Sequence, residues 1–95
     1  MAKIKIIWSR KAKKKLYSFL DFYIRESKSK SFSINLYKMI SKEIKLLRKH
    51  PYQGMKTNDE SILGFIIDSF IIYYELTDNH VAIHSVCEWP QKPDH

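Results

Sequence analysis

A histidine and a cysteine near the end of the sequence are the side chains whose types best suit catalytic chemistry. His84 and Cys87 lie in the stretch HVAIHSVC, residues 80–87. His84 could serve as a general acid or base if it faces an open surface, and the alternative is a histidine that fills the edge of a sheet. Cys87 has no identifiable base paired with it, so we interpret it as a small apolar filler rather than a nucleophile.

Lysine and arginine side chains offer a second kind of chemistry, the binding of anions. Lys56 is the only cation in the loop that follows Gly54, where it either meets an anionic group or stays solvated. A denser group lies in the stretch SRKAKKK and consists of Arg10, Lys11, Lys13, Lys14 and Lys15. These side chains cannot all fit on the buried side of one helix, so most of them must face solvent or a partner.

The positive charge belongs to the first half of the chain. Residues 1–50 carry 15 Lys and Arg against three acidic residues, a net charge of +12, whereas residues 51–95 carry two against seven, a net charge of −5. Such asymmetry favours a polyanionic partner, either nucleic acid or an acidic protein segment. The alternative is a lysine-rich face that only keeps the protein in solution.

Composition limits the remaining classes of protein. The 95 residues, 44% of them hydrophobic, suit one domain over residues 1–95 with a modest core. The single cysteine excludes an internal disulfide, and no Cys or His spacing suggests zinc, so we expect no metal and no cofactor. A reducing, cytoplasmic location fits this cysteine use. No segment approaches the roughly 18 apolar residues of a membrane span, so we expect a soluble protein.

Hydrophobic periodicity predicts the elements that must position these side chains. Residues 3–8 alternate as a strand does, and residues 10–26 and 30–49 show the spacing of two helices that form an antiparallel hairpin. The second helix should end before His50, because Pro51 disfavours the helical conformation of the residue before it. Runs 61–67 and 70–76 predict a β-hairpin around Asp68 and Ser69, and residues 80–87 a last strand after the turn 77–79.

The expected fold is therefore α+β, with the order β-α-α-β-β-β and a four-stranded, mainly antiparallel sheet. We expect the first two strands to run antiparallel and the last three to form a meander. The helical hairpin should pack on one face and leave the other partly bare. Tyr73 and Tyr74 point to opposite faces of their strand, so one belongs to the core and the other is free to meet a base or a partner.

Three stretches taken together resemble a known family. These are IIWSRKAKKKLYSFLDFYI, LYKMISKEIKLLRKHPYQG and ILGFIIDSFIIYYEL, followed by a closing strand with a Gln-x-Pro tail. Their order and spacing resemble the RelE/ParE superfamily, the toxins of bacterial type II toxin–antitoxin modules, over essentially the whole chain. The resemblance implies one of two activities: cleavage of mRNA in the ribosomal A site, or action on DNA gyrase.

The sequence departs from this resemblance at the positions that matter for RNA cleavage. Relatives often carry arginine at the position of Leu63, and again in an Arg-Gln-Asn-Pro motif that falls here on Pro90, Gln91, Lys92 and Pro93. Arginine suits phosphate because its planar fork matches phosphate oxygens. Lys92 is left as a substitute cation.

The resemblance implies a toxin that inhibits growth when free and is neutralised by an acidic antitoxin, and the missing arginines favour action on gyrase in the ParE manner. One alternative is a RelE-like ribosome-dependent mRNA endoribonuclease that uses Lys56, His84 and Lys92. The other is a degenerate domain that only binds its antitoxin. In each case the resemblance implies that the cluster Arg10–Lys15 and a groove beside the helical hairpin receive the antitoxin, or that the same lysines contact nucleic-acid phosphates.

Overall fold

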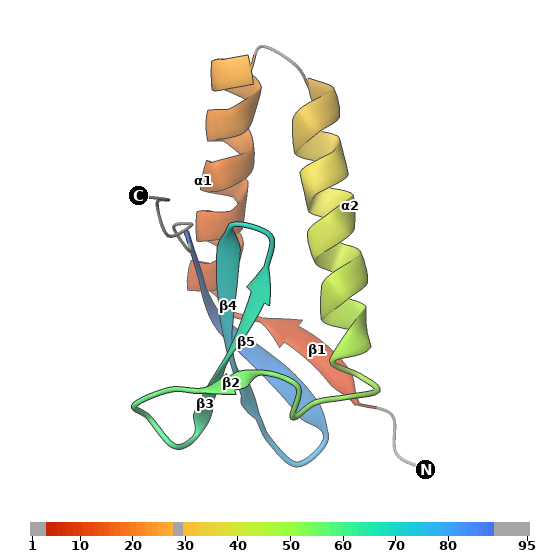
Figure 1. Ribbon diagram of the computed structural model, residues 1–95, viewed down its shortest axis with the longest axis vertical. Helices are drawn as coiled ribbons and strands as arrows, with labels where there is room; N and C mark the ends of the chain where they lie inside the picture. Colours follow the sequence, from red (N-terminus) through yellow and green to blue (C-terminus); the bar gives the residue numbers. More distant parts are fainter. Residues whose placement is uncertain (1–3, 28–29, 89–95) are drawn as a thin grey trace, which may run out of the picture.

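The computed structural model describes residues 4–27 and 30–88 and shows a helical hairpin packed on a twisted sheet (Figure 1). Its elements are β1 (Lys5–Trp8), α1 (Arg10–Ser27), α2 (Lys30–Leu46), β2 (Met55–Lys56), β3 (Ile62–Ile67), β4 (Phe70–Leu76) and β5 (His80–Glu88). The α+β class and the element order are confirmed. The sheet has five strands rather than four, because the two-residue strand β2 lies in a segment that we had expected to be a loop.

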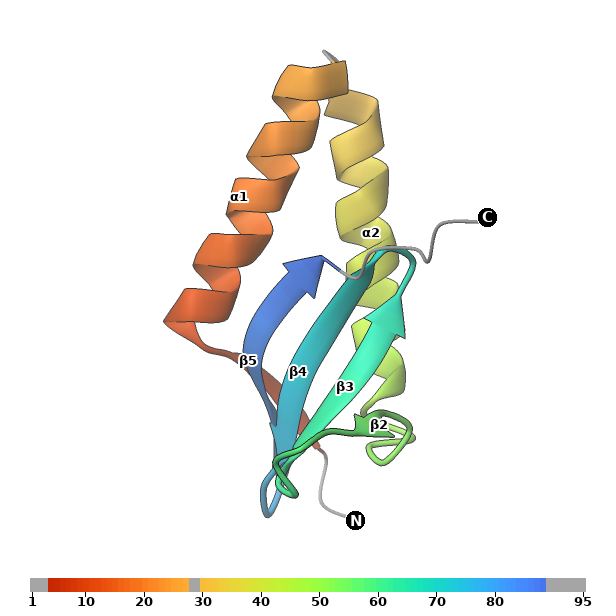
Figure 2. The same ribbon diagram turned by 60° about the vertical axis from the view of Figure 1, so that its left-hand side comes forward.

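The strand order is β1-β5-β4-β3-β2, with the β1–β5 pair parallel and the other pairs antiparallel (Figure 2). The meander β3-β4-β5 is confirmed. The prediction that the first two main strands run antiparallel is wrong, since these pairings make β1 and β3 run in the same direction. The reason is where α2 ends: Arg48 Nε donates to the Ile4 carbonyl oxygen at 3.1 Å, so the chain returns to the end of the sheet where β1 begins.

Local signals fix both ends of the helical hairpin. Ser9 caps α1, because its Oγ accepts a hydrogen bond from Ala12 N at 3.0 Å. At the other end α2 stops at Leu46, three residues before the predicted limit. Leu47, Arg48 and Lys49 instead donate to carbonyls three residues back, which is a tighter turn than an α-helix.

The core lies between the hairpin and the face of the sheet that it covers. Its largest fully buried side chains are Tyr74, Phe70, Ile40, Leu47, Ile72, Ile83, Val81 and Val86. Tyr74 is thus the tyrosine that faces the core, while Tyr73 is half-buried on the other face. Within the described ranges, no helix is long and apolar enough to cross a membrane.

The Tyr74 hydroxyl ties the loop after α2 to the sheet. It donates to the Pro51 carbonyl at 2.8 Å and accepts from Gly54 N at 3.0 Å. A Cβ on Gly54 would lie 2.7 Å from this hydroxyl and 3.0 Å from the Gly64 carbonyl, so only glycine allows the loop to approach this closely. The contact fixes the start of β2, where Lys56 lies.

Candidate partner-binding groove and open sheet face

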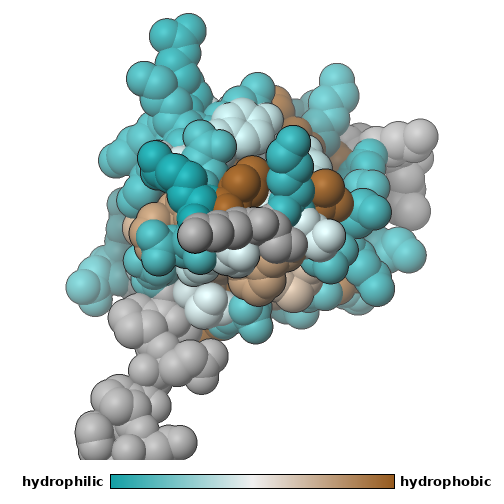
Figure 3. All heavy atoms as spheres, turned by 90° about the horizontal axis from the view of Figure 1, so that it is seen from above, coloured by the Kyte–Doolittle hydropathy of each residue, from teal (hydrophilic) through white to brown (hydrophobic). Residues whose placement is uncertain are grey.

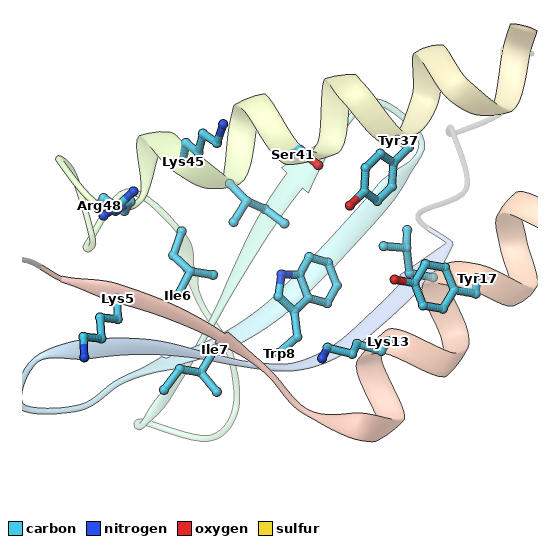
Figure 4. A pocket seen from close by; sticks show the side chains of 12 residues that line it. Lys5, Ile6, Ile7, Trp8, Lys13, Tyr17, Tyr37, Ser41, Lys45 and Arg48 are labelled. Atoms are coloured by element: carbon cyan, nitrogen blue, oxygen red, sulfur yellow. The ribbon is translucent and has the colours of Figure 1, made fainter.

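A groove of about 560 Å³ separates β1 from the helical hairpin (Figure 4). Its apolar base combines side chains from β1, α1 and α2, and its rim carries cations. The lining residues are Lys5, Ile6, Ile7, Trp8, Lys13, Leu16, Tyr17, Tyr37, Ser41, Ile44, Lys45 and Arg48. Concave, largely apolar surfaces with a few polar groups are where proteins receive ligands and peptide segments.

Aromatic side chains line the middle of the groove. Figure 4 shows Trp8 at its centre, with Tyr37 on α2 and Tyr17 on α1 beside it. Strand alternation turns Ile6 and Trp8 towards the helices, whereas Tyr17 and Tyr37 lie on helix sides next to the buried stripes and stay 55% and 44% exposed. Exposed tyrosines and a partly buried tryptophan are typical anchors of protein interfaces.

All charged side chains that line the groove are positive. Its rim carries Lys5, Lys13, Lys45 and Arg48, and no acidic side chain lines it. Within the described part of the chain, the only ion pair joins His84 to Glu75, so none of the four cations is neutralised there. The groove therefore combines an apolar base with positive charge that is unpaired within the described residues.

The structure divides the basic cluster that the sequence singled out. Lys13 lines the groove, whereas Arg10, Lys11, Lys14 and Lys15 line a second, shallower hollow on α1. Helical geometry explains the division, because residues 13 and 17 share one side of the helix while 11 and 15 share another. The Lys15 ammonium reaches the half-buried Cys87, with Nζ 3.4 Å from Sγ.

On the face of the sheet away from the helices, His84 forms a pair with Glu75. His84 is the extra residue of a β-bulge, since Tyr74 pairs with Ile83 and Tyr73 with Ser85. Its Nε2 lies 2.9 Å from Glu75 Oε1, and both side chains are exposed enough to meet solvent. The sequence had not indicated this carboxylate, which orients the imidazole, and the acid or base interpretation of His84 stays a prediction.

Lys56 and His84 do not come together. Lys56 pairs with Leu63, and Leu63 with Tyr74, so the lysine belongs to the helix-facing side of the sheet. His84 lies three strands away on the opposite face, a separation of about 14 Å at the usual strand spacing of about 4.8 Å.

The C-terminal motif Pro90, Gln91, Lys92 and Pro93 lies outside the described residues, so the prediction for Lys92 stays a prediction. No cluster of three or more His, Cys, Asp or Glu side chains in residues 4–27 and 30–88 could hold a metal ion. Sequence reasoning placed a groove beside the hairpin but missed Trp8, Tyr17, Tyr37 and Arg48 as its lining. The sequence signal that could have indicated this lining is the position of Tyr17 and Tyr37, two exposed tyrosines beside the apolar stripes of the helices.

A helical hairpin on a meander sheet, with a parallel first strand and a basic aromatic groove, defines this protein as a toxin-type domain of the RelE/ParE superfamily. More narrowly, the chain belongs to the ParE toxin family of type II toxin–antitoxin systems, parDE, whose model matches residues 6–87. Membership of this family implies that the partner of this protein is an antitoxin.

Solved structures share the fold at low sequence identity. One, from the chromosomal ParDE toxin–antitoxin system of P. aeruginosa, is similar with a TM-score of 0.81 and 15% identity, covering 93% of this chain and 98% of that one. Another, the YoeB dimer from Staphylococcus aureus, has a TM-score of 0.60 and 19% identity, covering 95% of this chain and 100% of that one. No curated protein matches the chain.

Proposed function

We propose that this protein inhibits growth when free and acts on DNA gyrase, as the ParE assignment favours, rather than by cleaving mRNA. The observation that carries the proposal is the separation of Lys56 from His84 by three strands and by the thickness of the sheet. Cleavage of RNA through its 2′-hydroxyl needs a base at the hydroxyl and cations around the same phosphate. These two side chains cannot both reach one phosphate.

The surroundings of His84 also disfavour a phosphate group. Glu75 lies 2.9 Å from the imidazole. Hydrogen bonds from the backbone and the hydroxyl of Ser61 lower the pKa of Asp59, and nearby His84 adds a smaller effect of the same sign. Two carboxylates thus stand near the candidate base, where they repel an anionic substrate. The described arginines, Arg10, Arg25 and Arg48, all belong to the helical hairpin or to the turn that ends it.

A two-stage assay tests this proposal. Purified protein is added to a cell-free translation reaction that is driven by ready-made mRNA, and transcript ends are mapped by primer extension. We expect intact message and undisturbed translation, followed by inhibition of gyrase in a separate supercoiling assay. Cuts inside codons on ribosome-bound message would overturn the proposal. Undisturbed translation with unaffected supercoiling would leave a domain that only binds its antitoxin.

The His84–Glu75 pair keeps mRNA cleavage as the second candidate, because a carboxylate that orients an imidazole is a common arrangement for a general base. If message is cut, His84→Ala should abolish the cuts and Lys56→Ala should leave them, since only the histidine occupies the open face. Loss of the cuts with Lys56→Ala would show that the lysine substitutes for a missing arginine from the other face.

We further propose that the groove receives an acidic, amphipathic segment of the antitoxin. Apolar side chains of such a segment would cover Trp8, Tyr17 and Tyr37, and its carboxylates would meet Lys13 and Lys45 on opposite walls. Desolvated aromatic contacts supply most of the affinity in interfaces of this kind, while the charges set orientation and the rate of encounter.

A synthetic peptide of alternating leucine and glutamate blocks tests the groove. Its binding is followed by Trp8 fluorescence in a Trp89→Phe background. We expect the double variant Lys13→Glu, Lys45→Glu to weaken binding at least tenfold. The matched control Lys14→Glu, Lys42→Glu carries the same net charge but changes lysines outside the groove, so it should bind within about threefold of the parent. Equal weakening by both variants would show that net charge, not the groove, determines binding.

A further inference from the structure

A second exposed aromatic surface lies at the free end of the helical hairpin. Tyr23 is its centre: its ring lies 5.4 Å from that of Phe22 and 5.3 Å from that of Phe32, in edge-to-face contacts. The Tyr23 ring also meets buried Phe70 at 6.2 Å, which fixes the cluster to the core. We call Phe22, Tyr23 and Phe32 the hairpin-end patch. Figure 3 looks down on this end of the molecule and shows apolar side chains among hydrophilic ones.

This patch lies on the other side of the hairpin from the groove. Phe22 follows Tyr17 by five residues, and Tyr37 follows Phe32 by five. Five residues turn a helix by about 140° beyond a full turn, because each residue contributes about 100°. On both helices, therefore, one aromatic side chain faces the groove and the other faces the patch.

Exposure of the Phe22 and Phe32 side chains to water is unfavourable, and a partner that covered them would remove this cost. Phe22 is 46% exposed and Phe32 is 49% exposed, although both touch Tyr23. Removal of apolar area from water is favourable. Clustered exposed aromatic side chains on a small protein mark interaction surfaces more often than chance positions do.

Carboxylates surround the hairpin-end patch, in contrast to the groove. Glu88 pairs with Phe70 in the sheet, and Asp68 is two residues before Phe70, whose ring meets that of Tyr23. Burial raises the pKa of Tyr23, and the Glu88 and Asp68 carboxylates raise it further. Glu26 is one helical turn beyond Phe22, on the same side of α1. All three carboxylates are exposed, and none forms an ion pair with another described residue. Arg25 lies three residues beyond Phe22 on α1 and adds one cation, so this acidic rim carries three carboxylates against one described arginine in a chain of net charge +7.

We propose that the hairpin-end patch binds a protein surface that carries lysine or arginine around an apolar centre. The acidic rim attracts such a surface and repels both nucleic acid and the acidic segment assigned to the groove. The claim that this partner differs from the antitoxin rests on the proposed role of the groove. Since the two surfaces lie on opposite sides of the hairpin, one protein molecule can hold both partners at once.

Two peptides of opposite charge provide the test, with the isotope-labelled protein followed by NMR. One peptide alternates leucine and lysine blocks, and the other alternates leucine and glutamate blocks. We expect the lysine peptide to shift signals of Phe22, Tyr23 and Phe32 and to leave those of Trp8 and Tyr37 in place. The glutamate peptide should do the reverse. The two arms are independent, so a failure of the groove proposal is visible separately from a failure of this one.

Paired variants then test which side chains contribute to the binding of each peptide. Phe22→Ser, Phe32→Ser should weaken the lysine peptide at least tenfold and leave the glutamate peptide unchanged, and Tyr17→Ser, Tyr37→Ser should do the opposite. Glu26→Lys, Glu88→Lys keeps the aromatic side chains and should also weaken the lysine peptide at least tenfold, so the proposal does not depend on the serine variants. Circular dichroism and thermal melting check that each variant is folded.

Four results would overturn the proposal. The first is absence of lysine-peptide binding at the patch, and the second is equal shifts at the patch and in the groove. The third is a shift of patch signals by a short single-stranded oligonucleotide, which would indicate nucleic acid instead. The fourth is a shift with protein concentration alone, which would make a second copy of this chain the occupant.

Discussion

At the residue scale, Tyr74 is the side chain at which we expect a very small change, the loss of one hydroxyl group, to lower the free energy of unfolding most. Its hydroxyl is buried and holds two backbone groups of the loop after α2. In Tyr74→Phe, the Gly54 amide and the Pro51 carbonyl lose their partner while remaining partly shielded from water. Unfolding in urea should show a loss of about 1–3 kcal/mol.

Tyr73→Phe is the matched control for this variant. Tyr73 occupies the same strand and is half-buried on the other face, and its hydroxyl makes no hydrogen bond to another described residue. Its stability should stay within about 0.5 kcal/mol of the parent. Equal losses in the two variants would mean that the hydroxyl of Tyr74 contributes no more than the hydroxyl of half-buried Tyr73.

Burial of Tyr74 also predicts a response to alkaline pH. Its pKa is raised, first by burial and against a smaller opposing effect of the hydrogen bond from Gly54. The unfolded chain therefore loses this proton first, at about pH 10, while the folded protein keeps it. Stability should be full below about pH 10 and should fall as the pH rises towards the folded-state pKa.

The fall should be smaller in Tyr74→Phe than in the parent. It should not vanish, because the pKa of Tyr23 is raised as well. The comparison is made by urea unfolding between pH 8 and 11, since lysine titration in the same range affects both proteins alike. Identical pH dependence in the two proteins would show that Tyr74 ionises as readily folded as unfolded.

At the element scale, Ser9 joins the first helix to two strands. Its Oγ accepts from Ala12 N at 3.0 Å and donates to the His84 carbonyl at 3.2 Å, while its amide donates to the Ile83 carbonyl. Ser9→Ala removes the cap and one bond to the bulge in β5. We expect a loss of about 1–2 kcal/mol in chemical unfolding.

Ser18→Ala serves as its control, because Ser18 is exposed in the middle of α1, where alanine is the better helix former. That variant should be as stable as the parent or slightly more so. If Ser9→Ala were equally harmless, the start of α1 would be held by its packing and not by the serine.

At this scale the sequence predicts elements that depend on residues close together in the chain, and it does not predict contacts between distant residues. Both helices and the β3–β4 hairpin were predictable because apolar spacing and turn residues act within a few positions. The pairing of Lys5 with His80 was not, since neither strand carries a mark of its partner 75 residues away. The same holds for the groove. The helical periodicity predicts that Tyr17 and Tyr37 are exposed, but only the fold places them beside Trp8.

At the scale of the whole molecule, the division of charge predicts how association depends on salt. Cations gather in the first half of the chain, and four of them surround the groove. Raising NaCl from about 0.05 M to about 0.5 M shortens the screening length several-fold and should slow association of the leucine–glutamate peptide at least tenfold. Dissociation should change much less, because the aromatic contacts are not screened.

Stopped-flow fluorescence of Trp8 separates these two rates. The leucine–lysine peptide, followed through a fluorescent label of its own because Trp8 lies in the groove, should respond in the same direction at the hairpin-end patch. A neutral leucine–serine peptide should show no salt dependence at either surface. A salt effect confined to dissociation would indicate that the rim cations act only after contact.

The parallel pairing of β1 with β5 has a consequence for the time at which this protein becomes active during its synthesis. A chain is made from its N-terminus, so β1 exists long before residues 80–83, its strand partners, have been added. Until then β1 has no strand to pair with, so only its contacts with the hairpin, such as the Arg48 bond to the Ile4 carbonyl, hold the β1 wall of the groove. The growing polypeptide therefore carries neither a finished binding surface nor a finished toxin, and both arise together in one late step.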